Sequence, residues 1–344
     1  MKVFRWLLLP LSWIYGYLTF LRNKFYDWGF FNSYKIQEKS ITVGNLSAGG
    51  TGKTPHVDYL IQHFLEENTK ISVLSRGYGR KTKGLFRAKA DSPASDIGDE
   101  PRQYKQRYGD KIEVVLAEKR IVGVEFIAQN FPENELIILD DAFQHRAVSA
   151  GFSILITPFD DLFTNDLMLP TGNLREWKSG KKRADMVIIS KSPQEIHTTK
   201  EAEIRQQIGF PENRLFFSSL QYTDLVPFNR AKPETKIEFV LLVTGIGNPT
   251  SLLDFWKSKC HVQLMAFPDH HNYSKADIKA IHEKFGKFAS KNKVIITTEK
   301  DFMRLQQFEE VFEEENAWHY QPITVTIKNQ HVFNARIDDY FRQV

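Results

Sequence analysis

The sequence has very little cysteine: Cys260 is the only one among its 344 residues. A single cysteine cannot form a disulfide within the chain or build a structural zinc site of cysteines, so we expect a reducing compartment. Long runs of lysine and arginine are also missing, and the net charge is a mild +4. Nucleic acid is therefore not an expected partner, although the positive excess suits anionic partners in general.

No alanine occurs before Ala48, so the N-terminus lacks the small-residue cleavage site of a signal peptide. The stretch from Trp6 to Leu21 is largely apolar, but its 16 residues fall short of the roughly 20 that span a bilayer. Twelve aromatic residues fall within residues 1–34, and cationic residues flank the apolar stretch. We expect a helix that attaches to a membrane surface; a buried helix covering the core is the alternative. The expected apolar face holds Ile14, Tyr17, Leu18, Leu21 and Phe25.

A glycine-rich run between an apolar strand and an amphipathic helix resembles a phosphate-binding loop. The strand pattern at 41–43 leads into this run at 44–54, and apolar residues recur at helical spacing over 57–65. Such a loop holds phosphates with backbone N–H groups and a lysine, and Mg²⁺ with a hydroxyl. Ser47 stands where the usual pattern, Gly-x-x-x-x-Gly-Lys-Ser/Thr, opens with glycine. We predict a nucleotide site of Asn45, Ser47, Ala48, Gly49, Gly50, Thr51, Gly52, Lys53 and Thr54.

Short apolar runs alternate with helical patterns along the rest of the chain. They predict an α/β fold with a P-loop type parallel sheet covered by helices on both faces. The expected strands of this sheet lie at 71–74, 112–116, 136–139, 152–156, 186–189 and 215–217. After a connector at 222–236, strands at 239–243, 262–265 and 294–296 predict a second, smaller α/β domain. We expect an N-terminal helix at 1–34, a P-loop domain at 35–225 and a small domain at 226–344, whose last strand at 323–327 is a candidate to return to the first domain.

Two acidic segments supply candidate metal ligands and a candidate base. An apolar strand that ends in Asp140 and Asp141 is typical of the element that delivers a carboxylate to Mg²⁺ beside a phosphate loop. Asp99 and Glu100 lie in Gly-Asp-Glu-Pro, which predicts a rigid tight turn. A carboxylate mounted there could orient an acceptor hydroxyl and take its proton, and plain turn chemistry is the alternative.

Asp269, His270 and His271 follow an expected strand of the small domain. They could hold a metal, or one histidine could pair with a catalytic carboxylate from the other domain. A helix cap with solvated histidines is the alternative. Two loops that combine glycine and arginine, at 75–80 and 169–176, suit a phosphate group, and Arg120 is a weaker candidate of the same kind.

Taken in order, these segments resemble the tetraacyldisaccharide 4′-kinase family of lipid A biosynthesis. The sequence departs from the family pattern at Ala142, where glycine is usual, and at Trp177, where proline is usual. The matching stretches are Val43–Pro55, Ser75–Arg80, Gly98–Pro101, Leu139–His145, Leu169–Glu176, Thr244–Pro249, Pro268–Tyr273 and Thr297–Asp301.

The resemblance implies a kinase that uses ATP and Mg²⁺ at the cytoplasmic face of a Gram-negative inner membrane. Its acceptor is a lipid A disaccharide precursor, phosphorylated at the 4′-hydroxyl, and no obligate protein partner is implied. The family makes Asp99 the base, assisted by His270 with Asp269 behind it. Lys53 and Thr54 then hold ATP and Mg²⁺. The other implied residues are Asp140, Asp141 and Glu100 at the metal, and Arg76, Tyr78, Arg120, Arg175 and Glu176 toward the acceptor.

A nucleotide switch of the metal-insertion or protein-targeting kind is the rival hypothesis, because it would share the phosphate loop and the acidic strand. The sequence has no good Asn-Lys-x-Asp guanine-binding motif: Thr298–Asp301 is a poor substitute and lies far along the chain. It also has no cysteine pair for metal delivery. ATP turnover that depends on the lipid acceptor, and leaves phosphate on it, would discriminate the two.

Overall fold

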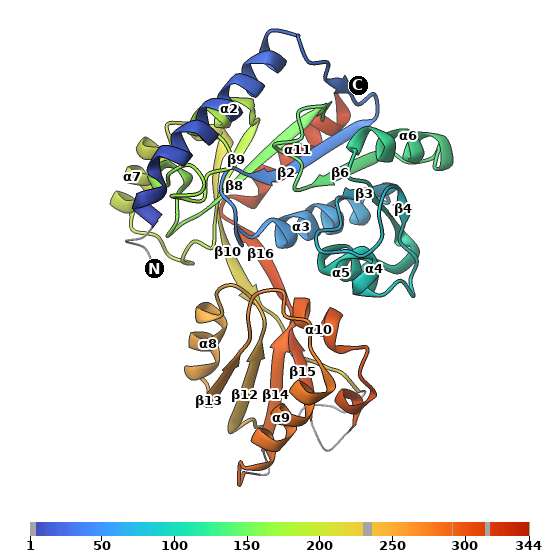
Figure 1. The fold of residues 1–344 in the computed structure, drawn as a ribbon, viewed down its shortest axis with the longest axis vertical. Coiled ribbons are helices and arrows are strands. Elements are labelled where there is room, and N and C mark those ends of the chain that lie inside the picture. Colours follow the sequence, from blue (N-terminus) through green and yellow to red (C-terminus); the bar gives the residue numbers. More distant parts are fainter. Residues whose placement is uncertain (1–4, 230–235, 291, 314–316, 344) are drawn as a thin grey trace.

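Two α/β domains make up the computed structural model, which describes residues 5–229, 236–290, 292–313 and 317–343. A nine-stranded sheet forms the upper part of the molecule in Figure 1 and a five-stranded sheet the lower part. The α/β class expected from the sequence is confirmed. Within the expected connector, Val226–Pro227 forms the short strand β11, and residues 230–235 lie outside the described residues.

The large sheet has the strand order β16-β10-β9-β8-β2-β6-β3-β5-β4. All of its pairings are parallel except those of the two edge strands β16 and β4. Its inner strands are almost wholly buried because helices cover both faces, which explains their continuous apolar sequences. The strands are β2 (Lys39–Asn45), β3 (Ile71–Ser75), β4 (Phe86–Arg87), β5 (Ile112–Leu116), β6 (Leu136–Asp140), β8 (Phe152–Pro158), β9 (Met186–Ser190), β10 (Leu215–Tyr222) and β16 (Ile323–Ile327).

Five helices cover the large sheet. The core cluster that contains Ile138 joins one face to three of them, and the cluster that contains Ile137 lies on the opposite face, as period-two alternation requires. The first face carries α3 (Lys53–Glu66), α5 (Asp99–Tyr108) and α11 (Gln330–Arg342). The second face carries α6 (Arg120–Asn130) and α7 (Thr198–Ile208).

The small sheet has the order β11-β15-β14-β12-β13, and only β11 pairs antiparallel. One face packs against α9 and α10, and the other against α8. These elements are β12 (Phe239–Thr244), β13 (His261–Ala266), β14 (Lys293–Thr298), β15 (Trp318–Gln321), α8 (Thr250–Lys257), α9 (Lys275–Gly286) and α10 (Glu299–Leu305). A two-stranded sheet of β1 (Tyr34–Lys35) and β7 (Val148–Ser149) and the short α4 (Ala94–Ile97) complete the fold.

The chain returns to the large sheet at its end. Strand β16 pairs antiparallel with β10, and Phe333 and Ile337 of α11 join the core of the large sheet. Residues 323–342 therefore lie with the first domain, so the range 226–344 does not hold one structural unit. The division of the chain near residue 225 stays an interpretation.

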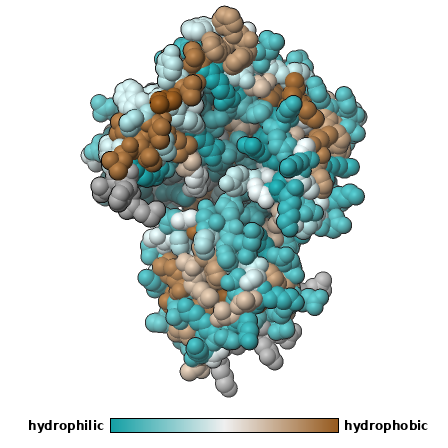
Figure 2. Space-filling view, in the orientation of Figure 1, coloured by the Kyte–Doolittle hydropathy of each residue, from teal (hydrophilic) through white to brown (hydrophobic). Residues whose placement is uncertain are grey.

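The N-terminal helix α2 (Leu9–Asp27) follows a short 3₁₀ turn at Trp6–Leu8 and crosses the upper domain in Figure 1. Many of its apolar side chains are exposed, among them Ile14, Tyr17 and Leu18 of the expected face, whereas Leu21 and Phe25 are partly buried. Its only buried residues are Ser12 and Gly16. The hydrophobic patch along this helix stands out in Figure 2. The alternative of a helix that buries its apolar face in the core is therefore wrong. Among the residues that the structure describes, no helix is both long and apolar enough to cross a bilayer.

Candidate active site

The predicted phosphate loop connects β2 to α3 at the carboxyl edge of the large sheet. Neighbouring segments hold the loop in place through two hydrogen bonds. Ser190 Oγ donates to the carbonyl oxygen of Thr51 at 2.7 Å, and Ala48 N–H donates to the carbonyl oxygen of Asn173 at 2.7 Å. The inner side is open, because a Cβ atom built on Gly49 or Gly50 would meet no atom within 4 Å. The first turn of α3 also offers backbone N–H groups without helical partners. The loop therefore suits phosphate groups.

Two cations share one carboxylate beside this loop. Lys53 Nζ lies 3.5 Å from Asp141 Oδ1, and Arg175 Nη1 lies 3.1 Å from both oxygens of the same group. Burial opposes the ionisation of Asp141, but the positive charges of Lys53 and Arg175 outweigh it and lower the pKa of that carboxyl group. The arrangement brings together three of the residues predicted from the sequence.

Asp140 is buried at the end of β6, where Tyr104 O–H donates to its Oδ2 at 3.2 Å. Burial, followed by the negative charges of Asp141 and Glu100, raises the pKa of Asp140 to about 7. A buried carboxylate with so little compensation, beside a second carboxylate, fits a divalent cation, which prefers oxygen ligands. Thr54 lies in the first turn of α3 and could add its hydroxyl.

Asp99 opens a helix instead of lying in a tight turn as expected. It is the first residue of α5, and Pro101 falls within the first turn, where its missing N–H costs nothing. Gly98, with φ +91°, precedes the helix in a conformation that a side chain would disfavour. The Asp99 carboxylate is almost fully buried at this helix N-terminus.

His270 reaches Asp99 from the small domain. The imidazole Nδ1 lies 3.1 Å from Asp99 Oδ2, although the two residues are 171 positions apart. His270 has φ +57°, a left-handed conformation that is uncommon for a residue with a side chain and often marks functional sites. The two domains already hold this pair in contact, so no further closure is needed to form it.

Two further cations surround the pair and were not assigned from the sequence. Lys300 Nζ lies 3.2 Å from His270 Nε2 and 2.8 Å from Glu100 Oε1. Arg304 Nε lies 3.5 Å from Asp99 Oδ2. Asp269, expected behind His270, is 4.0 Å from the Nε2 atom, beyond hydrogen-bonding distance. Lys300 lies in the matching stretch 297–301, to which the resemblance attached no role, and Arg304 lies outside every matching stretch.

The candidate acceptor residues divide into two groups. Arg76 and Tyr78 are exposed, and the Tyr78 ring centroid lies 5.5 Å from that of His270. Arg120 is buried and donates to the carbonyl oxygen of Ala117, with its pKa lowered to about 10 mainly by burial. Glu176, also buried, binds Arg183 and accepts from Asn23 of α2 at 2.9 Å. The structure thus buries the side chains of Arg120 and Glu176, and their role toward the acceptor stays a prediction.

A model of the family described as tetraacyldisaccharide-1-P 4′-kinase matches residues 4–342. This chain belongs to that family. The tetraacyldisaccharide 4′-kinase of Bacteroides fragilis is 41% identical over 357 residues, which cover 99% of this chain and 94% of that protein. The enzyme of the same name from Flavobacterium psychrophilum is 40% identical over 346 residues, covering 99% and 98%. The family predicted from the sequence is confirmed, and nothing supports the nucleotide-switch alternative.

The kinase also resembles a solved structure over nearly its whole length. The crystal structure of LpxK from Aquifex aeolicus, described as an "apo" form in complex with ATP, superposes with a TM-score of 0.75 at 26% sequence identity. The match covers 98% of this chain and 99% of that one. Both domains and the N-terminal helix of this kinase therefore follow the family architecture.

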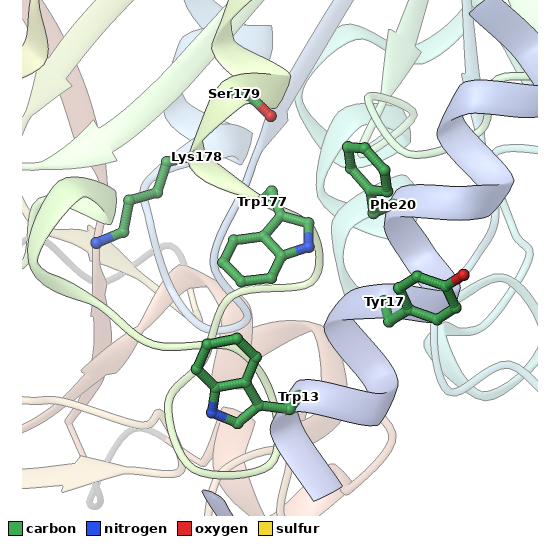
Figure 3. A pocket seen from close by; sticks show the side chains of 6 residues that line it. All are labelled: Trp13, Tyr17, Phe20, Trp177, Lys178 and Ser179. Atoms are coloured by element: carbon green, nitrogen blue, oxygen red, sulfur yellow. The ribbon is translucent and has the colours of Figure 1, made fainter. Parts of the chain in front are cut away.

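The loop that carries Arg175 links the phosphate loop of the kinase to helix α2. Arg175 N–H donates to the carbonyl oxygen of Leu46 at 2.8 Å, and Tyr15 O–H of α2 donates to the carbonyl oxygen of Arg175 at 3.0 Å. Trp177 Nε1–H donates to the carbonyl oxygen of Gly16 at 2.7 Å. The outer side of this junction is an apolar pocket of about 440 Å³ (Figure 3), lined by Trp13, Tyr17, Phe20, Trp177, Lys178 and Ser179.

Proposed function

We propose that this kinase transfers the γ-phosphoryl group of ATP to the 4′-hydroxyl of a tetraacylated glucosamine disaccharide 1-phosphate, with Asp99 as the base. The observation that carries the proposal is the contact between Asp99 and His270 across the two domains. Glu100, the residue after Asp99, links this pair to the predicted metal site, because its negative charge contributes to the raised pKa of Asp140. A carboxylate near a nucleotide site is what phosphoryl transfer to an alcohol requires.

On the nucleotide side, Lys53 and Arg175 supply the positive charge. Both now neutralise Asp141, and both are placed to balance the charge that spreads over the transferred phosphoryl oxygens. Asp140, Asp141 and the Thr54 hydroxyl would hold Mg²⁺. When bound, the ion supplies Lewis-acid charge that screens the phosphate oxygens.

On the acceptor side, Asp99 orients the 4′-hydroxyl and takes its proton as the oxygen attacks phosphorus. His270 and Arg304 hold the carboxylate in place from the small domain. Tyr78, exposed beside His270, and the exposed Arg76 would contact the sugar and its phosphate. Arg120 and Glu176 act indirectly, by supporting the loops around them.

The exposed face of α2 would bring the kinase to its acceptor. An acylated disaccharide stays in the membrane, so the enzyme must work at the membrane surface. We infer a peripheral position on the cytoplasmic face of the inner membrane, where ATP is present. The aromatic pocket between α2 and Trp177 suits acyl chains of the acceptor, because its lining is almost wholly apolar.

The test compares Asp99→Asn, His270→Ala and the double variant with the unchanged enzyme. Each is incubated with ATP, Mg²⁺ and the disaccharide 1-phosphate, and one added phosphate is followed by mass spectrometry. We expect Asp99→Asn to lower kcat by about 100-fold or more with little change in KM for ATP, and the double variant to be little worse. Asp110→Asn is the matched control, because that side chain is 94% exposed. Near-normal turnover by Asp99→Asn would refute the proposal.

A further inference from the structure

Lys300 contacts the candidate dyad from a motif to which no role has been assigned. It lies in the first turn of α10, which Thr298 caps by accepting from Asp301 N–H. Its ammonium group stands between two acceptors, 3.2 Å from His270 Nε2 and 2.8 Å from Glu100 Oε1. Lys300 and Asp99 therefore contact different nitrogen atoms of the same imidazole ring, Nε2 and Nδ1 respectively.

The chemistry of the three groups fixes the position of one proton. An ammonium group has three donors and no acceptor, so His270 Nε2 must accept in this contact. A neutral imidazole that accepts at Nε2 carries its proton at Nδ1. That Nδ1–H then donates to Asp99 Oδ2, whose carboxylate is an acceptor when ionised.

We propose that Lys300 is a positioning residue that holds His270 in the Nδ1–H tautomer and so keeps the imidazole donating to Asp99. The inference rests on the proposed role of Asp99 as the base. In this arrangement His270 orients the carboxylate and does not take the proton that Asp99 receives from the acceptor hydroxyl. Lys300 thus makes the contact with His270 Nε2 that the family resemblance led us to expect from Asp269.

The surroundings of Lys300 keep its amino group charged, as the contact requires. Burial opposes the charge, but the carboxylates of Glu100 and Asp99 outweigh it and raise the pKa of Lys300. Its helix is held to the small domain by Asp301, which is fully buried and accepts from Gly245 N–H at 3.0 Å and Tyr273 O–H at 3.1 Å. The ammonium is therefore delivered from a rigid element.

The direct test is the tautomer of His270 in the full-length enzyme labelled with ¹⁵N-histidine. The signal is assigned by comparison with His270→Ala. We expect the ring to carry its proton at Nδ1 in the unchanged enzyme and to shift toward the Nε2–H form in Lys300→Met. Lys279→Met, which removes an exposed lysine of α9, should leave the signal unchanged. An unchanged enzyme that shows Nε2–H would overturn the inference.

Kinetic measurements show whether Lys300 affects catalysis through its contact with His270 or through its contact with Glu100. Loss of one charge-assisted hydrogen bond predicts a fall in kcat of roughly 10- to 100-fold for Lys300→Met, with KM for ATP nearly constant and partial recovery in Lys300→Arg. In a His270→Ala background the same change should cost less than about twofold, since the partner is gone. An undiminished loss there would refute the role. Activity retained by Asp99→Asn would instead defeat the proposed base, and the tautomer measurement would stand independently.

Discussion

Arg107 and Glu299 form an ion pair that joins the two domains, with Arg107 Nε 2.6 Å from Glu299 Oε1. The same guanidinium group also binds Asp58. Arg107 lies on α5, Asp58 on α3 and Glu299 on α10, so a single side chain ties together three helices. Helix α3 begins with Lys53 of the phosphate loop, and α5 begins with Asp99, the candidate base. Helix α10 begins with Glu299 itself, the residue before Lys300. The geometry of the site thus depends on a buried contact at the domain boundary.

Arg107→Met should destabilise the protein strongly. Asp58 and Glu299 are both almost fully buried, and removing their cation leaves two carboxylates without charge compensation. Breaking a buried pair of this kind costs about 3–5 kcal/mol. Urea denaturation should show this loss and partial recovery when Glu299→Gln is added. Arg87→Met removes a pair whose arginine side chain is 51% exposed and should cost less than about 1 kcal/mol. Equal losses for the two variants would contradict the prediction.

Lys53→Met should lower kcat by about 100-fold or more, because the transferred phosphoryl group loses a preorganised cation. The fold should tolerate the change, since Arg175 still neutralises Asp141. Lys191→Met provides the comparison: its ammonium binds the carbonyl oxygen of Gly50 from outside the loop at 2.7 Å. We expect that variant to raise KM for ATP more than it lowers kcat. A Lys53→Met enzyme with normal kcat would show that the loop is not the nucleotide site.

His145 should contribute to acid instability. Burial, followed by the positive charges of Arg120, Arg22 and Arg76, lowers the pKa of His145 from 6.5 to about 4. The unfolded chain therefore takes up a proton near pH 6.5 that the folded protein resists until about pH 4. Stability from this group is fully present above about pH 6.5 and is lost as the pH falls through that window.

The check is the urea midpoint at pH 7.5 and pH 5 for the unchanged protein and for His145→Gln. We expect a smaller drop between the two pH values in the variant, because its side chain has no proton to take up. His331→Gln, at an exposed position on α11, should reproduce the drop of the unchanged protein. If His145→Gln loses as much stability as the unchanged protein, other groups carry the pH dependence.

The sequence predicted the strands well because buried parallel strands are continuously apolar, and the expected runs at 112–116 and 323–327 coincide with β5 and β16. It also paired Asp99 with His270 through the family motifs. It did not reveal Lys300 or Arg107, because a contact between residues on different domains leaves no local pattern. The burial of Glu176 was not foreseen for a similar reason: no local sequence pattern indicates its contact with Asn23 of α2.

The exposed face of α2 should be the part of the kinase that binds the membrane. Leu11 and Leu18 are 54% and 58% exposed, while the opposite side of the helix docks through Ser12 and Gly16. The double variant Leu11→Glu/Leu18→Glu should therefore bind vesicles of phosphatidylethanolamine and phosphatidylglycerol at least roughly tenfold more weakly, because it loses apolar burial and gains repulsion from anionic lipids.

The matched control adds the same two charges elsewhere: Val122→Glu/Val332→Glu changes two side chains that are each 38% exposed, on α6 and α11. It should co-sediment with vesicles as the unchanged kinase does. Both double variants should bind ATP normally, since neither alters a side chain of the phosphate loop. A short-chain, water-soluble acceptor should be phosphorylated by the α2 variant at a near-normal rate, whereas the membrane-bound acceptor should not. Equal vesicle binding by the two double variants would show that α2 is not the membrane contact.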